Sequence, residues 1–162
     1  MGHDKALYQE LIKLFDPNGV ILFLTKTDMS KPFLDSELEP LRKFYYMWGD
    51  TPAKKFKNAN IELCKEKLWN KVDTFLEIIS VHTFYVDQDY ELKERTVCEA
   101  TELKAGPNQF QEVVDELESV RADIVSDYNN LVAAYAHSST FSYRILALFV
   151  SCIGWITKRY MS

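Results

Sequence analysis

The sequence predicts an all-α fold: a long antiparallel helical hairpin of the coiled-coil type, two shorter helices packed on it, and a C-terminal apolar helix. Apolar residues recur at heptad spacing through residues 107–137, which is typical of helices that pack along a seam. The 162 residues include only 5 Gly and 5 Pro, which suits long helices better than many strands. Residues 145–157 carry no charge and predict a helix that is apolar on every side.

The first 34 residues predict one amphipathic helix followed by less regular structure. The segment DPNG at residues 16–19 predicts a turn that ends this helix. The apolar run at residues 20–24 fits either a helical turn or a buried extended segment, and residues 25–34 predict a loop. The apolar side of the helix over residues 4–15 consists of Leu7, Leu11, Leu14 and Phe15.

Two helices are predicted between residues 36 and 84. Ser36 and Glu39 have the spacing of a capping box, which starts a helix that continues to Trp48. Thr51 as N-cap and Pro52 at the first helical position start the next helix, which runs to about residue 84 with a weak point at residues 58–60. The seam of this second helix consists of Leu68, Val72, Phe75 and Ile79.

Residues 87–106 are polar and predict a long connection with one irregular element at most. The helices on either side of it are similar in length, so we expect them to pack antiparallel as a hairpin. That order predicts Lys54, Lys55 and Lys57 near Asp123 and Asp127. The seam of the helix over residues 107–137 consists of Phe110, Val114, Leu117, Ile124, Tyr128 and Leu131.

Composition and charge disfavour several classes of function. Residues 87–137 carry 12 acidic and 4 basic side chains, and this charge balance disfavours nucleic acid as a partner. Cys64, Cys98 and Cys152 have no short spacing, which suits reduced thiols in the cytoplasm better than disulfides or a metal site. The N-terminus lacks the apolar stretch of a secretory signal.

Neither a catalytic motif nor a cofactor or metal motif stands out, so no cofactor or metal site is expected. The absence of these motifs favours a non-enzymatic protein but leaves open whether the protein is an enzyme. His82 is expected at a helix end with its hydrogen bond satisfied. His137 falls near the opposite end of the hairpin, so the two histidines should not share a metal. Residues 87–91 resemble the start of a calcium loop, but Leu92 and Cys98 stand where that loop needs glycine and an acid.

A helix that is apolar on every side must be buried on every side, so residues 138–160 belong in a bilayer, in a partner or in the protein's own core. The uncharged run would rise about 20 Å, which is short against a hydrocarbon thickness of about 30 Å. Residues 138–157 contain only one charged residue, Arg144, and carry aromatic residues near both ends. The expected membrane or partner interface consists of Ile145, Leu146, Leu148, Phe149, Val150, Ile153, Trp155 and Ile156.

The sequence therefore predicts two parts, a helical bundle domain at residues 1–137 and an apolar C-terminal helix at residues 138–162. The expected function is that of a cytoplasmic, non-enzymatic interaction protein, which residues 138–160 tether to a membrane or to a partner. Protein partners, or further copies of the chain, would bind through helix faces. The alternatives are a small helical enzyme whose acidic residues hold a metal, and a toxin-like protein whose terminal helix damages membranes.

Overall fold

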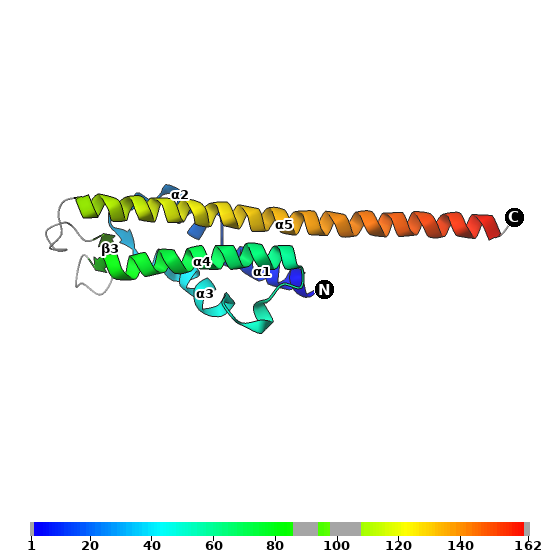
Figure 1. The fold of residues 1–162 in the computed structure, drawn as a ribbon, viewed down its shortest axis with the longest axis horizontal. Coiled ribbons are helices and arrows are strands. Elements are labelled where there is room, and N and C mark those ends of the chain that lie inside the picture. The colour runs from blue at the N-terminus through cyan, green and yellow to red at the C-terminus, as the bar shows by residue number, and fades with distance from the viewer. Residues whose placement is uncertain (1, 86–93, 98–107, 161–162) are drawn as a thin grey trace.

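The chain is mostly helical in the computed structural model of the protein, which confirms the predicted all-α class (Figure 1). The structure describes residues 2–85, 94–97 and 108–160, with side chains for residues 2–85, Thr96 and residues 109–138. Two short 3-10 turns, η1 (Asp35–Leu38) and η2 (Pro52–Lys54), precede the third and fourth helices. The α-helices are α1 (His3–Leu14), α2 (Val20–Lys26), α3 (Glu39–Trp48), α4 (Ala59–His82) and α5 (Asn108–Tyr160).

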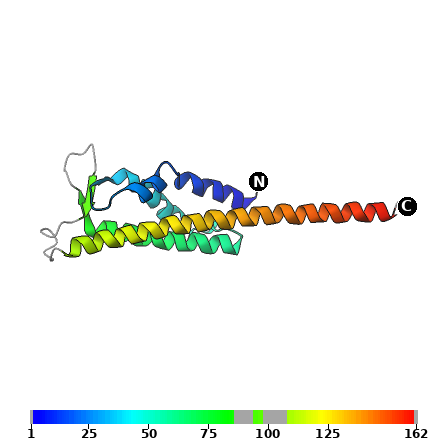
Figure 2. The ribbon, with the colours of Figure 1, turned by 90° about the horizontal axis from the view of Figure 1, so that it is seen from above.

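The two longest helices, α4 and α5, lie side by side and run in opposite directions (Figures 1 and 2). An ion pair between Lys71 Nζ and Asp123 Oδ2, 2.7 Å apart, joins their surfaces. The four seam residues predicted in α4 are all buried, and those predicted in α5 are buried except for Phe110, which is partly exposed. The heptad spacing thus coincides with the side of each helix that faces the core.

Helices α1, α2 and α3 pack against this pair and complete one hydrophobic core. Phe15, which directly follows α1, lies at its centre. Its ring meets Phe44 of α3 edge to face, with centroids 5.0 Å apart, and lies 5.4 Å from the ring of Tyr128 in α5. Phe15 therefore connects the end of α1 with α3 and α5 through aromatic contacts.

A small antiparallel sheet at one end of the body is a feature that the sequence did not predict. Its strands are β1 (Phe33–Leu34), β2 (Thr83–Tyr85) and β3 (Glu94–Val97), in the order β1–β3–β2. Strands this short are below the length at which alternating hydrophobicity can be recognised. Because Thr83 begins β2, α4 ends at His82, slightly before the predicted end of the helix.

The start of α4 corrects the prediction that a helix begins at Pro52. The chain forms only the turn η2 there and is extended at Lys55, where φ is −85° and ψ is 127°. The side chain of Asn58 accepts hydrogen bonds from the backbone N of Asn60 (3.0 Å) and of Ile61 (3.2 Å). These bonds satisfy free donors of the first helical turn, so the predicted weak point is the N-cap of α4.

The predicted capping box at Ser36 and Glu39 was also wrong. Ser36 lies inside η1, and α3 begins only at Glu39. The helix ends at Trp48, as predicted. The carboxylate that reaches back belongs to Glu37, whose Oε2 accepts a hydrogen bond from the backbone N of Leu34 at 3.3 Å. Earlier in the chain, the apolar run that the sequence left undecided is helical and forms α2.

The three lysines predicted near Asp123 and Asp127 lie elsewhere. Because residues 55–57 are not helical, this segment packs against α1 instead of continuing along α5. Lys54 pairs with Glu10 of α1, and its Nζ lies over the Trp48 ring, 5.1 Å from the centroid. In α4, it is Lys71 that takes the place beside Asp123.

Helix α5 continues past the end of the body, where α1 and α4 both begin (Figures 1 and 2). The rings of Tyr8 and Tyr135 stack just inside this end, which marks how far along α5 the body extends. Beyond it, the backbone of residues 140–160 projects as a single helix, and among the described residues no other element lies beside it.

Candidate functional site

The residues predicted to form a membrane or partner interface all lie in the projecting part of α5. The backbone there is one continuous helix, and the side chains of residues 139–160 lie outside the described set. At 3.6 residues per turn, the uncharged run covers every side of this helix. No acidic residue follows Asp127, and the only charged residues of the segment are Arg144, Lys158 and Arg159. The sequence of the projecting helix is thus an uncharged apolar run with basic residues before and after it.

The predicted seam residues, in contrast, form no open surface. Leu68, Phe75, Leu117 and Ile124 have no exposed area, because α4 and α5 bury them against each other and against the shorter helices. The large apolar residues that remain exposed on the body are spread over several elements: Leu22, Leu34, Tyr46, Met47, Leu63, Val81 and Tyr85. Scattered apolar residues of this kind are normal on a protein surface and do not mark a docking face.

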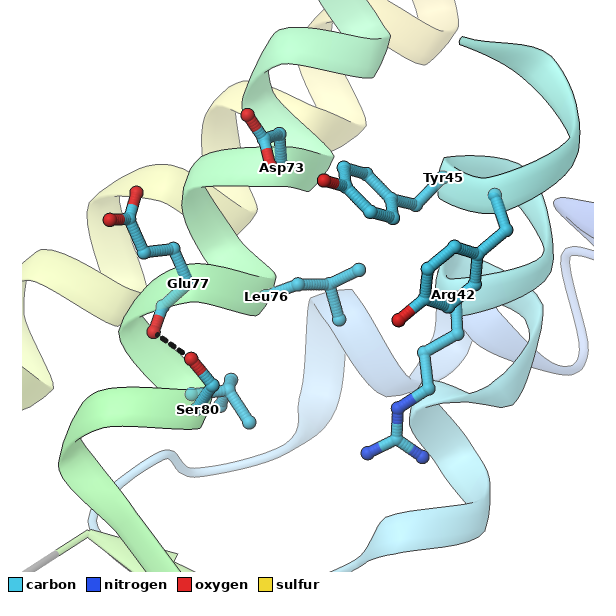
Figure 3. A pocket seen from close by; sticks show the side chains of 8 residues that line it. Arg42, Tyr45, Asp73, Leu76, Glu77 and Ser80 are labelled. Atoms are coloured by element: carbon cyan, nitrogen blue, oxygen red, sulfur yellow. Dashed lines mark hydrogen bonds between the residues drawn. The ribbon is translucent and has the colours of Figure 1, made fainter.

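A cleft of about 610 Å³ lies between α3 and α4, and aromatic and acidic side chains line it (Figure 3). The ring of Tyr45 stacks on Trp69 with the centroids 5.1 Å apart, and the indole Nε1 of Trp69 donates to the carbonyl of Tyr45 at 3.0 Å. These contacts hold the Tyr45 ring in place. Tyr46 also lines the cleft and is 76% exposed, and its ring meets that of Tyr45 edge to face with the centroids 5.1 Å apart.

The charge of this cleft is negative. Two short bonds join Arg42 to Asp35, at 2.9 Å and 2.6 Å, and this pairing raises the pKa of the guanidinium. The negative charge of Asp73 and its hydrogen bond to the phenol raise the pKa of Tyr45. Within the described residues, no ion pair neutralises Asp73 or Glu77. Two carboxylates beside exposed aromatic rings can contact a cationic group.

The cleft offers no nucleophile paired with a base among the described residues. The hydroxyl of Ser80 donates to the carbonyl of Glu77 at 2.8 Å, which is a local bond within α4 (Figure 3). Neither histidine nor cysteine lines the cleft. Its chemistry therefore suits contact with a cation better than bond cleavage.

A smaller cleft of about 340 Å³ surrounds a buried ion pair near the start of α4. Lys65 is only 2% exposed, and its Nζ lies 2.7 Å from Glu62 Oε1. The other carboxylate oxygen of Glu62 accepts a hydrogen bond from the backbone N of Phe56 at 2.8 Å. The pair thus connects α4 to the segment before it. Both charged groups already bind partners within the protein.

His82 and His137 lie apart, at opposite ends of the body. His82 ends α4 beside the sheet, whereas His137 lies near the end from which α5 projects. The predicted hydrogen bond of His82 is not found at its buried Nδ1, which has no partner among the described residues. At the end near His137, the Nε2 of His3 lies 2.9 Å from the carbonyl of Lys55.

The structure brings no metal ligands together in the part of the chain that it describes. No group of three or more histidine, cysteine, aspartate or glutamate side chains there could hold an ion. Residues 87–91, which resemble a calcium loop, fall outside the described residues. Cys64 is a free, partly buried thiol, and the side chains of Cys98 and Cys152 lie outside the described set.

Sequence reasoning missed both clefts, because each forms between segments distant in the chain. The only local signal for the larger cleft is the aromatic cluster at the end of α3, where Phe44 and Trp48 are buried, Tyr45 is partly buried and Tyr46 is exposed. For the smaller cleft, the spacing of Glu62 and Lys65 allows a helical ion pair, but nothing local indicates that the pair is buried.

In the part of the chain searched, namely its described residues, none of the helices is both long enough and apolar enough to cross a membrane. Comparisons with protein-family models, with curated proteins and with solved structures found no match.

Proposed function

We propose that the protein is a non-enzymatic helical interaction protein whose projecting segment, residues 138–160, tethers the helical body to a membrane. The observation that carries this proposal is that α5 leaves the body as a lone helix just before its apolar run begins. The proposal rests on where the backbone of this segment lies and on its sequence.

The position of the apolar run argues against burial in the protein's own core. The core is filled by side chains of α1 to α5 up to Leu131, whereas the apolar run begins at residue 145, about 15 Å along the helix from Tyr135. Full burial of a large apolar side chain is worth about 1.5–3 kcal/mol. Because the body does not cover the apolar segment at residues 145–157, we expect this segment to enter another apolar environment.

A bilayer fits this apolar segment better than a groove on a partner does. A groove covers one side of a helix, and a helix adapted to it keeps a polar side. Residues 145–157 have no polar side wide enough, since Ser151 and Thr157 are their only hydroxyl-bearing residues and none is charged. The aromatic residues Trp155 and Tyr160 stand near the distal end, as is common for helices that contact lipid.

Flotation of the full-length protein with phosphatidylcholine vesicles, followed by an alkaline wash, tests the proposal. The test variant carries Phe149→Asp and Val150→Asp in the projecting helix. The matched control carries Leu63→Asp and Val81→Asp, which places two acids at sites in α4 that are 51% and 63% exposed. Circular dichroism checks that both variants retain their helix content.

We expect the wild type and the control to float and to resist the wash, and the test variant to stay in the soluble fraction. Wild-type protein that fails to float, or a test variant that floats as well as wild type, contradicts membrane tethering. If the wild type instead forms a defined oligomer in solution that the test variant does not form, the segment joins copies of the chain.

A further inference from the structure

Three exposed lysines lie at the end of the body from which α5 projects. Lys5 lies in the first turn of α1, and Lys55 and Lys57 lie in the extended segment before α4. Hydrogen bonds hold these two segments together: the backbone N of Lys57 donates to Asp4 Oδ1 at 2.8 Å, and His3 Nε2 lies 2.9 Å from the carbonyl of Lys55. We call these three lysines the basic end.

The basic end lies at the level of α5 where the body stops. The stacked rings of Tyr8 and Tyr135 set the register between α1 and α5. Since α1 runs opposite to α5 (Figures 1 and 2), Lys5 lies about one turn beyond Tyr135, at the level of residues 138–139. From there to the apolar run at residue 145 is a rise of about 10 Å, which is close to the Debye length at physiological ionic strength.

The two segments at this end are rich in lysine although the chain as a whole is acidic: residues 3–6 and 54–58 carry four lysines and one aspartate. Lys55 also lines the smaller cleft together with Asp50 and Glu66. Both neighbouring acids in α1 are engaged: Asp4 accepts from the backbone N of Lys57 and Asn58, and Glu10 pairs with Lys54. Within the described residues, Lys5, Lys55 and Lys57 form no ion pairs. Asp4 in the first turn of α1 also accepts from Asn58, the N-cap residue of α4, so both helices begin at this end, and helix N-termini carry partial positive charge.

We propose that the basic end docks on the headgroups of anionic lipids when the projecting helix enters the bilayer. The inference rests on the proposed membrane tether and adds a preference for lipid charge. Lysines at the surface of an anionic membrane gain about 1 kcal/mol each, and this gain disappears within roughly a Debye length. The acidic residues of α5 all lie between Glu112 and Asp127, farther from the end where α5 leaves the body, so repulsion by the same surface favours contact through the basic end.

Vesicle binding by the full-length protein tests this docking. The probes are vesicles of phosphatidylcholine alone and vesicles in which part of it is replaced by phosphatidylserine. The test variant carries Lys5→Glu, Lys55→Glu and Lys57→Glu. The control carries Lys26→Glu, Lys31→Glu and Lys43→Glu, which changes the net charge equally at exposed positions outside the basic end.

We expect the wild type to bind the anionic vesicles roughly 100-fold more tightly than the neutral ones, which corresponds to three lysines. Added salt should reduce this preference. The test variant should lose the preference and still bind neutral vesicles, while the control keeps most of it.

Equal wild-type binding to both kinds of vesicle, or an equal loss in the test and control variants, overturns the docking of the basic end and leaves the tether intact. Wild-type protein that binds neither kind of vesicle overturns the tether and the docking together.

Discussion

The phenol rings of Tyr8 in α1 and Tyr135 in α5 stack face to face, with centroids 3.7 Å apart and planes within 3° of parallel. Partial burial and the neighbouring Tyr135 raise the pKa of Tyr8. This is the outermost contact in a series of aromatic pairs that continues inward to Phe15 and Tyr128. The stack fastens the beginning of α1 to α5 at the level where α5 leaves the body.

Replacing Tyr8 and Tyr135 singly and together should show that the two rings stabilise the fold cooperatively. We expect Tyr8→Ala, Tyr135→Ala and the double variant to give a coupling energy of about 0.5–1.5 kcal/mol in a double-mutant cycle. Urea unfolding in mild detergent measures the free energy of unfolding of the wild type and of the three variants. Tyr46→Ala, at a 76% exposed site, is the control and should change stability by less than about 0.5 kcal/mol. Strict additivity of the two single variants contradicts the coupling.

Breaking the buried ion pair of Lys65 and Glu62 should lower the free energy of unfolding more than breaking the exposed pair of Lys71 and Asp123. Lys65→Ala leaves the carboxylate of Glu62 without its cation in a largely buried place, and such a loss costs about 3–5 kcal/mol. Lys71→Ala removes a partner that is 42% exposed and should cost less than about 1 kcal/mol.

Urea unfolding of both variants makes this comparison. A third variant, Lys65→Met with Glu62→Leu, removes both charges together and should be less destabilised than Lys65→Ala alone. Equal losses for Lys65→Ala and Lys71→Ala contradict the burial of the first pair.

The N-cap at Asn58 predicts a position-specific effect on α4. Asn58→Ala removes the acceptor for the backbone N of Asn60 and Ile61 and should cost about 0.5–2 kcal/mol. Asn58→Asp keeps the acceptor and should retain most of the stability. Asn60→Ala, two residues later and exposed, is the matched control and should be neutral or slightly stabilising because alanine favours helix. The prediction fails if the two alanine variants unfold at the same urea concentration.

The carboxyl group of Asp28 should titrate far below its ordinary range. The Ser30 hydroxyl, 2.5 Å from Oδ1, is the main cause of a pKa of about 2, and Lys31 lowers the pKa further. Because the folded-state pKa lies below the unfolded value of 3.8, this carboxylate stabilises the fold above pH 3.8. That stabilisation is lost as the pH falls through about 2.

Carbon-13 NMR of the aspartate carboxyl groups measures this titration directly. Ser30→Ala should raise the pKa of Asp28 toward 3.8, because the strongest hydrogen bond to the charged form is gone. Ser36→Ala, in η1, is the control and should leave it unchanged. A pKa of Asp28 that does not respond to Ser30→Ala excludes the hydroxyl as the cause.

Elements that depend on local periodicity could be predicted from the sequence. The amphipathic pattern of α1, the aromatic and apolar side of α3 and the heptads of α5 each specify a helix within a single stretch of chain. The start of α4 could not be located in the same way. Pro52 and Asn58 both carry helix-start signals, and the contact of Lys57 with Asp4 of α1 favours the later one.

The sheet and the two clefts depend on contacts between distant segments. Phe33 pairs with Arg95 across 62 positions of the chain, and strands so short carry no pattern of their own. Tyr45 and Asp73 face the larger cleft from different helices. A polar residue such as Lys65 is expected on the surface, and only the packing around its ion pair makes burial acceptable.

The sequence by itself determined that the chain is helical and that its last helix contains an uncharged apolar run, because side-chain periodicity and hydrophobicity are local properties. Only the tertiary structure decided that this run lies beyond the body and that Lys5, Lys55 and Lys57 come together at the end from which the helix projects. Lys5 and Lys57 are far apart in sequence, and the backbone bonds to Asp4 that bring them together exist only once the chain has folded.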